Sequence, residues 1–188
     1  MCGRYSLDAD IDELINRYKA IILERETYNK KEVFPTDTQP LIINNKDGVN
    51  EIKFAKWGLS PSFAKQVIIN ARAETIDKKP LFRKAFLYNR CLIPVTSFFE
   101  WEKLGVKKIK RKISIENEEI FSLGGIIDQF GAFSIITTRA NEDMEKIHDR
   151  MPLIIKKEDE ALWLSTNNLS ESKLISLLIP YKYPLLIE

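Results

Sequence analysis

Residues 91–138 read CLIPVTSFFEWEKLGVKKIKRKISIENEEIFSLGGIIDQFGAFSIITT, and this stretch decides the fold class. Apolar and β-branched residues gather here in four runs, which cover residues 91–101, 108–115, 119–127 and 132–138. Short polar connections such as Asn117-Glu118 separate the runs. Runs of this length bounded by turn-forming residues predict consecutive β-strands.

The sequence on either side adds more strands and a few short helices. Residues 41–43 and 51–57 flank Lys46-Asp47-Gly48, which predicts a hairpin, and residues 67–69 form a further apolar run. Helices are predicted after Asp8-Ala9-Asp10 and at residues 80–86, 142–146, 158–164 and 171–178. Many strands with few helices predict an α+β, β-rich fold, in which short peripheral helices surround an antiparallel, barrel-like sheet.

Composition sets the broad class of the protein. Of the 188 residues, 44% are hydrophobic and 30% are charged, as in an ordinary globular protein, and no repeat or long linker interrupts them. We therefore predict one domain over residues 1–188. No run of about 18 apolar residues occurs, and the first residues lack a signal or transit pattern, so we expect a cytoplasmic protein without a membrane span. The net charge of +2 is too small to indicate nucleic-acid binding, and any DNA site must come from local charge.

The metal and disulfide chemistry of the chain is limited by its few ligands. Cys2, Cys91 and His148 are the cysteines and the histidine of the sequence. A disulfide would be unusual in a reducing compartment, and structural zinc sites take four cysteine or histidine ligands. We predict neither a metal site nor a cofactor.

Cys2 offers unusual chemistry if Met1 is removed, as methionine before a small residue commonly is. The terminal amine would then have an ordinary pKa of roughly 7.7–8.0, so that a useful fraction is neutral and can attack an aldehyde to give a Schiff base. The adjacent thiol could close on the imine carbon and form a five-membered thiazolidine, because an intramolecular nucleophile has a high effective concentration. The alternative is an incidental cysteine at a frayed terminus, and the residue itself does not decide between them.

Two further residues are candidates for proton transfer. Glu100 lies between Phe99 and Trp101, where loss of water raises the pKa of a carboxyl group and suits it to general-acid catalysis. The alternative is a glutamate at a strand end that faces solvent. His148 lies in a polar turn before Pro152, and an imidazole suits proton transfer near neutral pH, although a lone histidine is more often structural.

Other polar and aromatic residues fit a DNA site, with a structural alternative for each. Asn70 could orient a sugar hydroxyl and Arg72 could bind a phosphate, or the two could form an Asn turn followed by a surface ion pair. Trp57 could stack on a base, although burial in the core is the more frequent fate of tryptophan. The basic run at residues 107–112 could contact a DNA backbone or could be a solvated hairpin.

Seven motifs, in this order, resemble the SOS-response-associated peptidase family of abasic-site processing proteins. They are Cys2-Gly3-Arg4-Tyr5, Trp57-Gly58-Leu59, Asn70-Ala71-Arg72-Ala73-Glu74-Thr75, Arg90-Cys91-Leu92-Ile93-Pro94, Phe99-Glu100-Trp101, Ile136-Thr137-Thr138-Arg139-Ala140-Asn141 and His148-Asp149-Arg150-Met151-Pro152. The motifs span most of the chain, which makes a chance agreement of all seven implausible.

The resemblance implies a function and a set of site residues. It implies a β-rich monomer that binds single-stranded DNA and captures the ring-opened abasic sugar as a thiazolidine on Cys2. It also implies a protective role in the DNA damage response, a protein at the nucleoid when bound to DNA, and lyase or peptidase-like self-processing activity. The implied catalytic residues are Cys2, Asn70, Glu100 and His148, and the implied DNA contacts are Arg4, Pro40, Trp57, Arg72 and Arg150.

Two stretches depart from the family pattern. The family usually carries a tryptophan after Gly-Leu near its central strand, where this chain has Gly124-Gly125-Ile126-Ile127-Asp128. The early Ala-Pro-Thr-type loop of the family appears here as Phe34-Pro35-Thr36-Asp37. The first change should affect packing, and the second should affect the contacts of that loop, which include Pro40.

Two alternatives to this function remain open at this point. Amidohydrolases of the glutamine amidotransferase type also begin Met-Cys-Gly and use an N-terminal nucleophile, but an apolar strand usually follows, whereas charged Arg4 follows here. A non-enzymatic binder of single-stranded DNA would keep its affinity without forming a covalent product.

Overall fold

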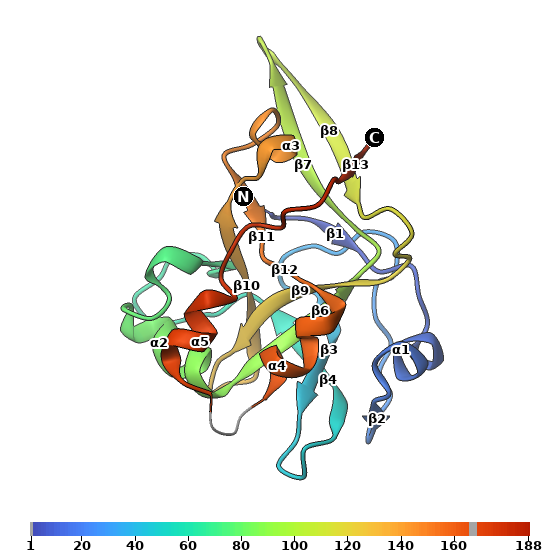
Figure 1. Cartoon of the computed structure of the whole chain (residues 1–188), viewed down its shortest axis with the longest axis vertical. Helices are drawn as coiled ribbons and strands as arrows, with labels where there is room; N and C mark the ends of the chain where they lie inside the picture. The colour runs from blue at the N-terminus through green and yellow to red at the C-terminus, as the bar shows by residue number, and fades with distance from the viewer. Residues whose placement is uncertain (1, 166–168) are drawn as a thin grey trace.

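β-Strands and short helices alternate along the chain, and the computed structural model describes residues 2–165 and 169–188 (Figure 1). The strands are β1 (Tyr5–Ser6), β2 (Ile21–Ile22), β3 (Thr38–Asn44), β4 (Asn50–Trp57), β5 (Asn70–Arg72), β6 (Arg90–Val95), β7 (Ser97–Leu104), β8 (Lys107–Ser114), β9 (Phe121–Ile127), β10 (Ala132–Arg139), β11 (Arg150–Pro152), β12 (Ile154–Ile155) and β13 (Leu186–Ile187). The helices are α1 (Ile11–Tyr18), α2 (Pro80–Tyr88), α3 (Glu142–Glu145), α4 (Glu160–Leu164) and α5 (Glu171–Ser176), with 3₁₀ turns at Ala73–Thr75 and Lys157–Asp159.

The larger sheet has nine strands and is partly closed on itself. Its order is β11-β10-β4-β3-β6-β9-β12, with β2 on β4 and β5 on β10. β10 also pairs with β9, so the path from β4 through β3, β6 and β9 returns to β10. The predicted β-rich fold with short helices is confirmed, but the sheet is not a strict antiparallel barrel, because β10 runs parallel to β4 and β5. Parallel pairs join segments that are far apart in sequence, which a local pattern of strands cannot reveal.

The smaller sheet is antiparallel and contains β1, β7, β8 and β13. β7 and β8 form a hairpin that projects at the top of Figure 1. The prediction of one strand over residues 91–101 is wrong at Thr96, where the chain leaves β6 of the larger sheet and enters β7 of the smaller one. The Thr96 N–H donates to the Ser6 carbonyl (2.8 Å), and its hydroxyl accepts from the Asp8 N–H (3.1 Å). An apolar run hides this change of sheet because the residues on both sides of Thr96 are buried.

The first helix forms where local sequence signals agree. The Asp10 carboxylate accepts from the Glu13 N–H (2.9 Å), and the Glu13 carboxylate accepts from the Asp10 N–H (2.6 Å), which is a capping box. Lys19 ends the helix in the left-handed conformation, with a φ of 49°. The apolar side of α1 packs against the larger sheet through Leu14 and Tyr18, which are buried.

The hairpin predicted around Lys46-Asp47-Gly48 is confirmed by the antiparallel pairing of β3 and β4. The region between β4 and β5 is less regular than its sequence suggests. The strand predicted at residues 67–69 begins instead at Asn70, and Ile68 makes only an isolated bridge to Leu59. This shift places Asn70 inside the sheet rather than in a turn after it.

Two apolar clusters lie on opposite faces of the larger sheet, because successive side chains of a strand point to opposite sides. Ile93 and Ile135 belong to the cluster that contains Cys2, whereas their neighbours Leu92 and Ile136 belong to the other. None of the helices in the described ranges is long and apolar enough to span a membrane.

The glycine pair in β9 lies within the stretch that departs from the family pattern. A Cβ at Gly125 would lie 2.7 Å from Ile93 Cδ1, 3.0 Å from Cys91 Sγ and 3.2 Å from the Ser134 carbonyl oxygen. The strand therefore has no room for a side chain at this position, and the small residue is a packing requirement.

We expect Gly125→Ala to lower the free energy of unfolding by about 1–3 kcal/mol, because the backbone of Ser134 cannot yield to the added methyl group. Gly124→Ala should cost less, since its Cβ would meet flexible side-chain atoms of Leu153 and Ile155. Chemical denaturation of the two variants and the wild type measures both. Equal midpoints for Gly125→Ala and wild type would show that the core accommodates the methyl group.

Candidate active site at the N-terminal cysteine

The N-terminal strand carries Cys2 into the interior. β1 lies between two neighbours, since the Val33 N–H donates to the Tyr5 carbonyl (2.7 Å) and the Phe99 N–H donates to the Arg4 carbonyl (2.9 Å). These bonds hold the start of the chain against β7. Cys2 is completely buried in consequence, and the alternative of an incidental cysteine at a frayed terminus does not fit this geometry.

Asn70 contacts the backbone of Cys2 directly. Its Nδ2 donates to the Cys2 carbonyl oxygen over 3.0 Å. Its Oδ1 is buried, and no donor reaches it within the described part of the chain. A buried acceptor without a donor is costly unless a ligand or water supplies one. Asn70 therefore holds the Cys2 backbone through one hydrogen bond and offers its Oδ1 as an acceptor for an incoming hydroxyl or amine.

Glu100 lies in β7, where it is 3% exposed, and it acts electrostatically on Cys2. Burial of the thiol, together with the negative charge of Glu100, raises the pKa of Cys2 to about 12. The thiol is therefore protonated at neutral pH and must lose its proton when sulfur forms a bond. The expectation of a carboxyl group removed from water is confirmed, and the alternative of a solvent-facing strand end is excluded.

His148 lies between α3 and β11, with its side chain 28% exposed. Its Nδ1 accepts from the Arg150 N–H (3.0 Å) and lies 2.8 Å from Asp149 Oδ1. The first neighbour suits a neutral imidazole and the second suits a protonated one. His148 can therefore hold a proton at Nδ1 or give it up without losing a partner for that nitrogen.

Arg72 and Arg150 lie on strands that pair with β10. Arg72 of β5 is opposite Thr137 of β10, and Arg150 of β11 is opposite Arg139 of β10. A hollow of about 540 Å³ lies there, lined by Arg72, Arg139, Ala140, Glu145, Asp149 and Arg150. Three arginines face two carboxylates in this lining, and Arg150 is also paired with Glu74, so Arg72 and Arg139 are the cations left to attract a phosphate.

The two arginines differ in their freedom to bind a ligand. Arg72 is exposed. Arg150 is 8% exposed, and its guanidinium donates to both Glu74 oxygens (2.6 and 3.0 Å) and to the Thr137 carbonyl (2.5 Å). Arg150 thus ties the 3₁₀ turn that contains Glu74 to β10, and its predicted contact with DNA would be made from this position.

Trp57 and Pro40 lie inside the protein. Trp57 has no exposed surface, its Nε1 donates to the Ile69 carbonyl (3.0 Å), and its ring packs on those of Tyr5 and Phe133. A base cannot stack on this buried ring, which instead packs against Tyr5 of the N-terminal strand. Pro40 is buried within β3, opposite Phe54. Direct DNA contacts by these two residues are not available in this conformation, because neighbouring strands cover both.

Arg4 has neighbours that the sequence did not indicate. Its guanidinium lies 3.8 Å from the ring centre of Phe34 and 5.5 Å from that of Trp101, and it donates to Glu32 over 2.8 Å. Lys110 of the basic run contacts the same carboxylate. The signal for Glu32 is weak, because one glutamate in a polar loop has no motif around it.

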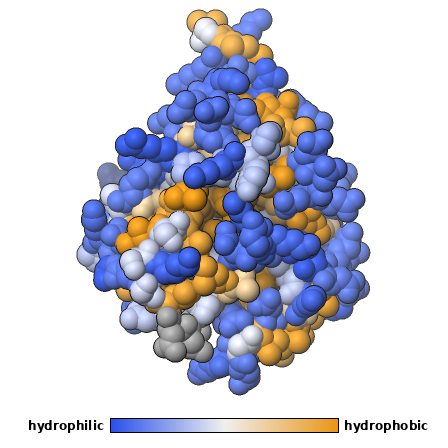
Figure 2. Space-filling view, in the orientation of Figure 1, coloured by the Kyte–Doolittle hydropathy of each residue, from blue (hydrophilic) through white to orange (hydrophobic). Residues whose placement is uncertain are grey.

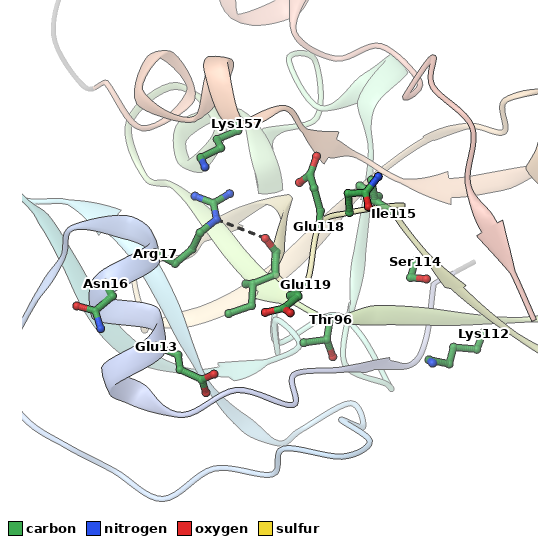
Figure 3. Close-up of a pocket in the computed structure, with 12 residues that line it drawn as sticks. Glu13, Asn16, Arg17, Thr96, Lys112, Ser114, Ile115, Glu118, Glu119 and Lys157 are labelled. Atoms are coloured by element: carbon green, nitrogen blue, oxygen red, sulfur yellow. Dashed lines mark hydrogen bonds between the residues drawn. The ribbon is translucent and has the colours of Figure 1, made fainter.

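A further hollow of about 890 Å³ is separate from this site (Figure 3). It lies between α1, the turn after β8 and the 3₁₀ turn at Lys157–Asp159, and Figure 3 shows both positive and negative side chains around it. Arg17, which lines this hollow, donates through Nε to the Ile120 carbonyl (3.4 Å). Lys112, at the end of the basic run, lines this hollow, whereas the predicted catalytic residues do not.

Within residues 2–165 and 169–188, no group of three or more histidine, cysteine, aspartate or glutamate residues is arranged to hold a metal ion. A hydrogen bond and an electrostatic interaction link Asn70 and Glu100 to Cys2, whereas His148 contacts its neighbours Asp149 and Arg150.

Comparisons with known proteins identify the family of this chain. Residues 1–186 match the family model "SOS response associated peptidase (SRAP)". The abasic site processing protein YoqW of Bacillus subtilis is 38% identical over 197 aligned positions, which cover 96% of this chain and 88% of that protein. The abasic site processing protein YedK of Escherichia coli is 27% identical, with coverage of 87% and 79%.

Solved structures show the same fold. A crystal structure of a protein from Bacteroides thetaiotaomicron superposes with a TM-score of 0.83 at 29% identity, and the match covers 99% of this chain and 91% of that one. A protein from Bordetella bronchiseptica superposes with a TM-score of 0.80 at 18% identity, covering 99% and 98%. The whole-chain match to the family model and the 38% identity to YoqW together show that this chain belongs to the SOS response associated peptidase family.

Proposed function

We propose that this protein processes abasic sites in single-stranded DNA by forming a covalent thiazolidine between Cys2 and the sugar. The observation that carries the proposal is the burial of Cys2 beside Asn70 and Glu100, so that its thiol lies near an amide acceptor and a carboxyl group, and removal of Met1 would add an amine. The names of the relatives YoqW and YedK, both abasic site processing proteins, support the same substrate.

The reaction requires removal of Met1, after which the α-nitrogen of Cys2 is a terminal amine. This nitrogen attacks C1′ of the ring-opened sugar, and the carbonyl oxygen becomes a hydroxyl group. The hydroxyl is protonated and leaves as water while nitrogen loses a proton, which gives an imine. Sγ then bonds to C1′, and the thiol proton passes to nitrogen. The adduct therefore forms with the net release of one water molecule.

The roles of the neighbouring residues follow from their positions. The Glu100 carboxylate takes the proton that nitrogen loses and passes it to the departing hydroxyl. It then carries the thiol proton to nitrogen, since the raised pKa of Cys2 keeps that proton on sulfur until attack. Asn70 Oδ1 accepts from the sugar or the amine. His148 moves protons between the sugar and Asp149. This role rests on its family motif and on the two neighbours of its Nδ1, the Arg150 N–H and the Asp149 carboxylate.

Closure of the thiazolidine explains how the activity would protect DNA. An open imine at C1′ withdraws electrons and favours β-elimination of the 3′ phosphate, which breaks the strand. Bonding of sulfur to C1′ removes the imine and with it this route. The proposed function is therefore protective, and any lyase or peptidase-like activity would depend on reopening the ring.

The two alternatives make different predictions. A glutamine amidotransferase would hydrolyse glutamine, and the match of the chain to a different family favours the abasic-site hypothesis. A non-covalent binder would keep DNA affinity and yield no product that survives denaturation. Glutamine hydrolysis and the yield of a denaturation-resistant DNA adduct can both be measured on the same protein preparation.

Denaturing electrophoresis tests the proposal with three matched single strands. One contains an abasic site, one is intact, and one contains an abasic site that borohydride has reduced to an alcohol. We expect a slow-migrating adduct with the first strand only, because only that strand offers an aldehyde. Equal adduct with the reduced strand, or none with any strand, would contradict the proposed function.

The exposed Arg72 predicts a specific change in DNA affinity. Arg72→Ala should weaken binding to intact and abasic strands equally, and it should reduce the log–log salt slope by about 0.7, the value for one single-strand phosphate contact. At low salt and saturating protein, the crosslinking rate should recover because the reacting groups remain. Binding titrations over a salt series measure the slope, and an unchanged slope would make Arg72 a structural residue.

A further inference from the structure

Three segments of the chain converge on one carboxylate beside the candidate active site. Arg4 comes from the N-terminal strand, Lys110 from β8, and Glu32 from the loop that precedes the Tyr5–Val33 bridge. Arg4 Nη1 donates to Glu32 Oε1 (2.8 Å), and Lys110 Nζ donates to the same oxygen. One acidic side chain is therefore shared by two cations, which leaves a net charge of +1 on the cluster.

Aromatic rings hold the two cations in place. The guanidinium of Arg4 contacts the rings of Phe34 and Trp101, and Lys110 Nζ lies 4.2 Å from the ring centre of Phe99. Such contacts fix the direction of each positive group without neutralising its charge. Arg4 and Lys110 consequently form a preformed two-point site for an anion, and in the free protein a carboxylate fills it.

We propose that Lys110 joins Arg4, whose DNA contact the family resemblance already implies, in one subsite for a backbone phosphate of single-stranded DNA, and that Glu32 fills this subsite in the free protein and gives way when DNA binds. A phosphodiester matches Glu32 in charge, so the exchange leaves the charge of the subsite unchanged. Both are oxyanions that accept hydrogen bonds from arginine and lysine. This inference rests on the proposed function, since it requires that DNA is the ligand.

The exchange is energetically accessible because the ion pairs are not deeply buried. The side chains of Arg4, Glu32 and Lys110 are 26%, 32% and 39% exposed. Ion pairs at this degree of exposure contribute little to stability, and the released carboxylate returns to water. The hydrogen bonds from Lys110 and Arg4 lower the pKa of Glu32, so at neutral pH it is charged and competes fully with phosphate.

The surface around the subsite suits a nucleic acid. The hairpin of β7 and β8 carries lysines at 103, 107, 108, 110 and 112, and Figure 2 shows a largely hydrophilic surface below its apolar tip. Phe34 is 41% exposed and lies next to the guanidinium of Arg4. Aromatic rings interleaved with cations are the features by which proteins bind single strands without reading sequence.

Glu32→Gln tests the proposal, with binding measured on an intact oligothymidylate that cannot crosslink. We expect affinity to rise about three- to tenfold at low salt, because the internal competitor loses its charge while the two cations remain. Glu116→Gln is the matched control, since it removes one negative charge from an exposed turn after β8 and should change affinity by less than about twofold.

A second variant separates local competition from a general change in charge. Lys110→Met alone should weaken binding, and in the Glu32→Gln background it should remove most of the gain. Equal effects of Glu32→Gln and Glu116→Gln, or a gain that persists without Lys110, would contradict the inference while leaving the proposed function intact. Absence of oligothymidylate binding by every variant would contradict both. Thermal unfolding of each variant verifies that the fold is retained.

Discussion

Cys2→Ser is expected to abolish the stable adduct with abasic DNA while leaving the amine reactive. Serine is also small, so Met1 should still be removed and the terminal amine should still form an imine. The hydroxyl is a much weaker nucleophile than sulfur and will not close the five-membered ring. Borohydride should therefore trap serine-variant complexes at close to the wild-type level, whereas complexes left unreduced should fall to background on denaturing gels.

Cys91→Ala is the matched control for this prediction. Cys91 is fully buried within β6 and carries no terminal amine beside its thiol, so it should take no part. Crosslinking by this variant should equal that of the wild type. Stable adduct in the Cys2→Ser variant without reduction would show that sulfur has no special role and would reject the thiazolidine.

Glu100→Gln is expected to slow covalent capture by about 10²–10⁴-fold, the usual contribution of a positioned acid or base. Glutamine keeps the size of the side chain but can neither donate nor accept the proton. DNA affinity should change little, since Glu100 is 3% exposed. Single-turnover crosslinking measured beside equilibrium binding separates the two quantities.

The same variant should also change the titration of Cys2. Glu100 is the second cause of the raised thiol pKa, after burial, so removal of its charge should lower that pKa while burial keeps it above the ordinary value of 9.0. Thiolate absorbance against pH in the Cys91→Ala background measures the shift. Glu102→Gln, two residues further along β7 and paired with Arg111, is the matched control. Rates within about threefold of the wild type for Glu100→Gln would make Glu100 a structural residue.

Local signals in the sequence predicted the elements whose cause is local. The capping box at Asp10 and Glu13, the turn at residues 46–48 and the proline at the start of α2 act within a few residues. The error at Thr96 arose because tertiary pairing, not local pattern, divides that apolar run between two sheets. The parallel neighbours of β10 were unpredictable for the same reason.

The candidate site divides in the same way. Family motifs predicted Cys2, Asn70 and Glu100, and the fold brings these three together. The motifs also include Trp57, but a motif records that a residue is needed and not whether it is exposed, and this ring lies in the core. Glu32 belongs to no motif, and its position between Arg4 and Lys110 depends on three segments that only the folded chain brings together.

Intact-mass measurement of the adduct, made without any reductant, tests the central claim most directly. The account predicts one species, with the mass of the chain lacking Met1 plus the abasic oligonucleotide minus one water molecule. Peptide mapping of that species should place the DNA remnant on Cys2. An adduct that retains Met1, or one attached to a lysine, would contradict the proposed chemistry, because only a terminal cysteine carries the amine and the thiol on adjacent carbons.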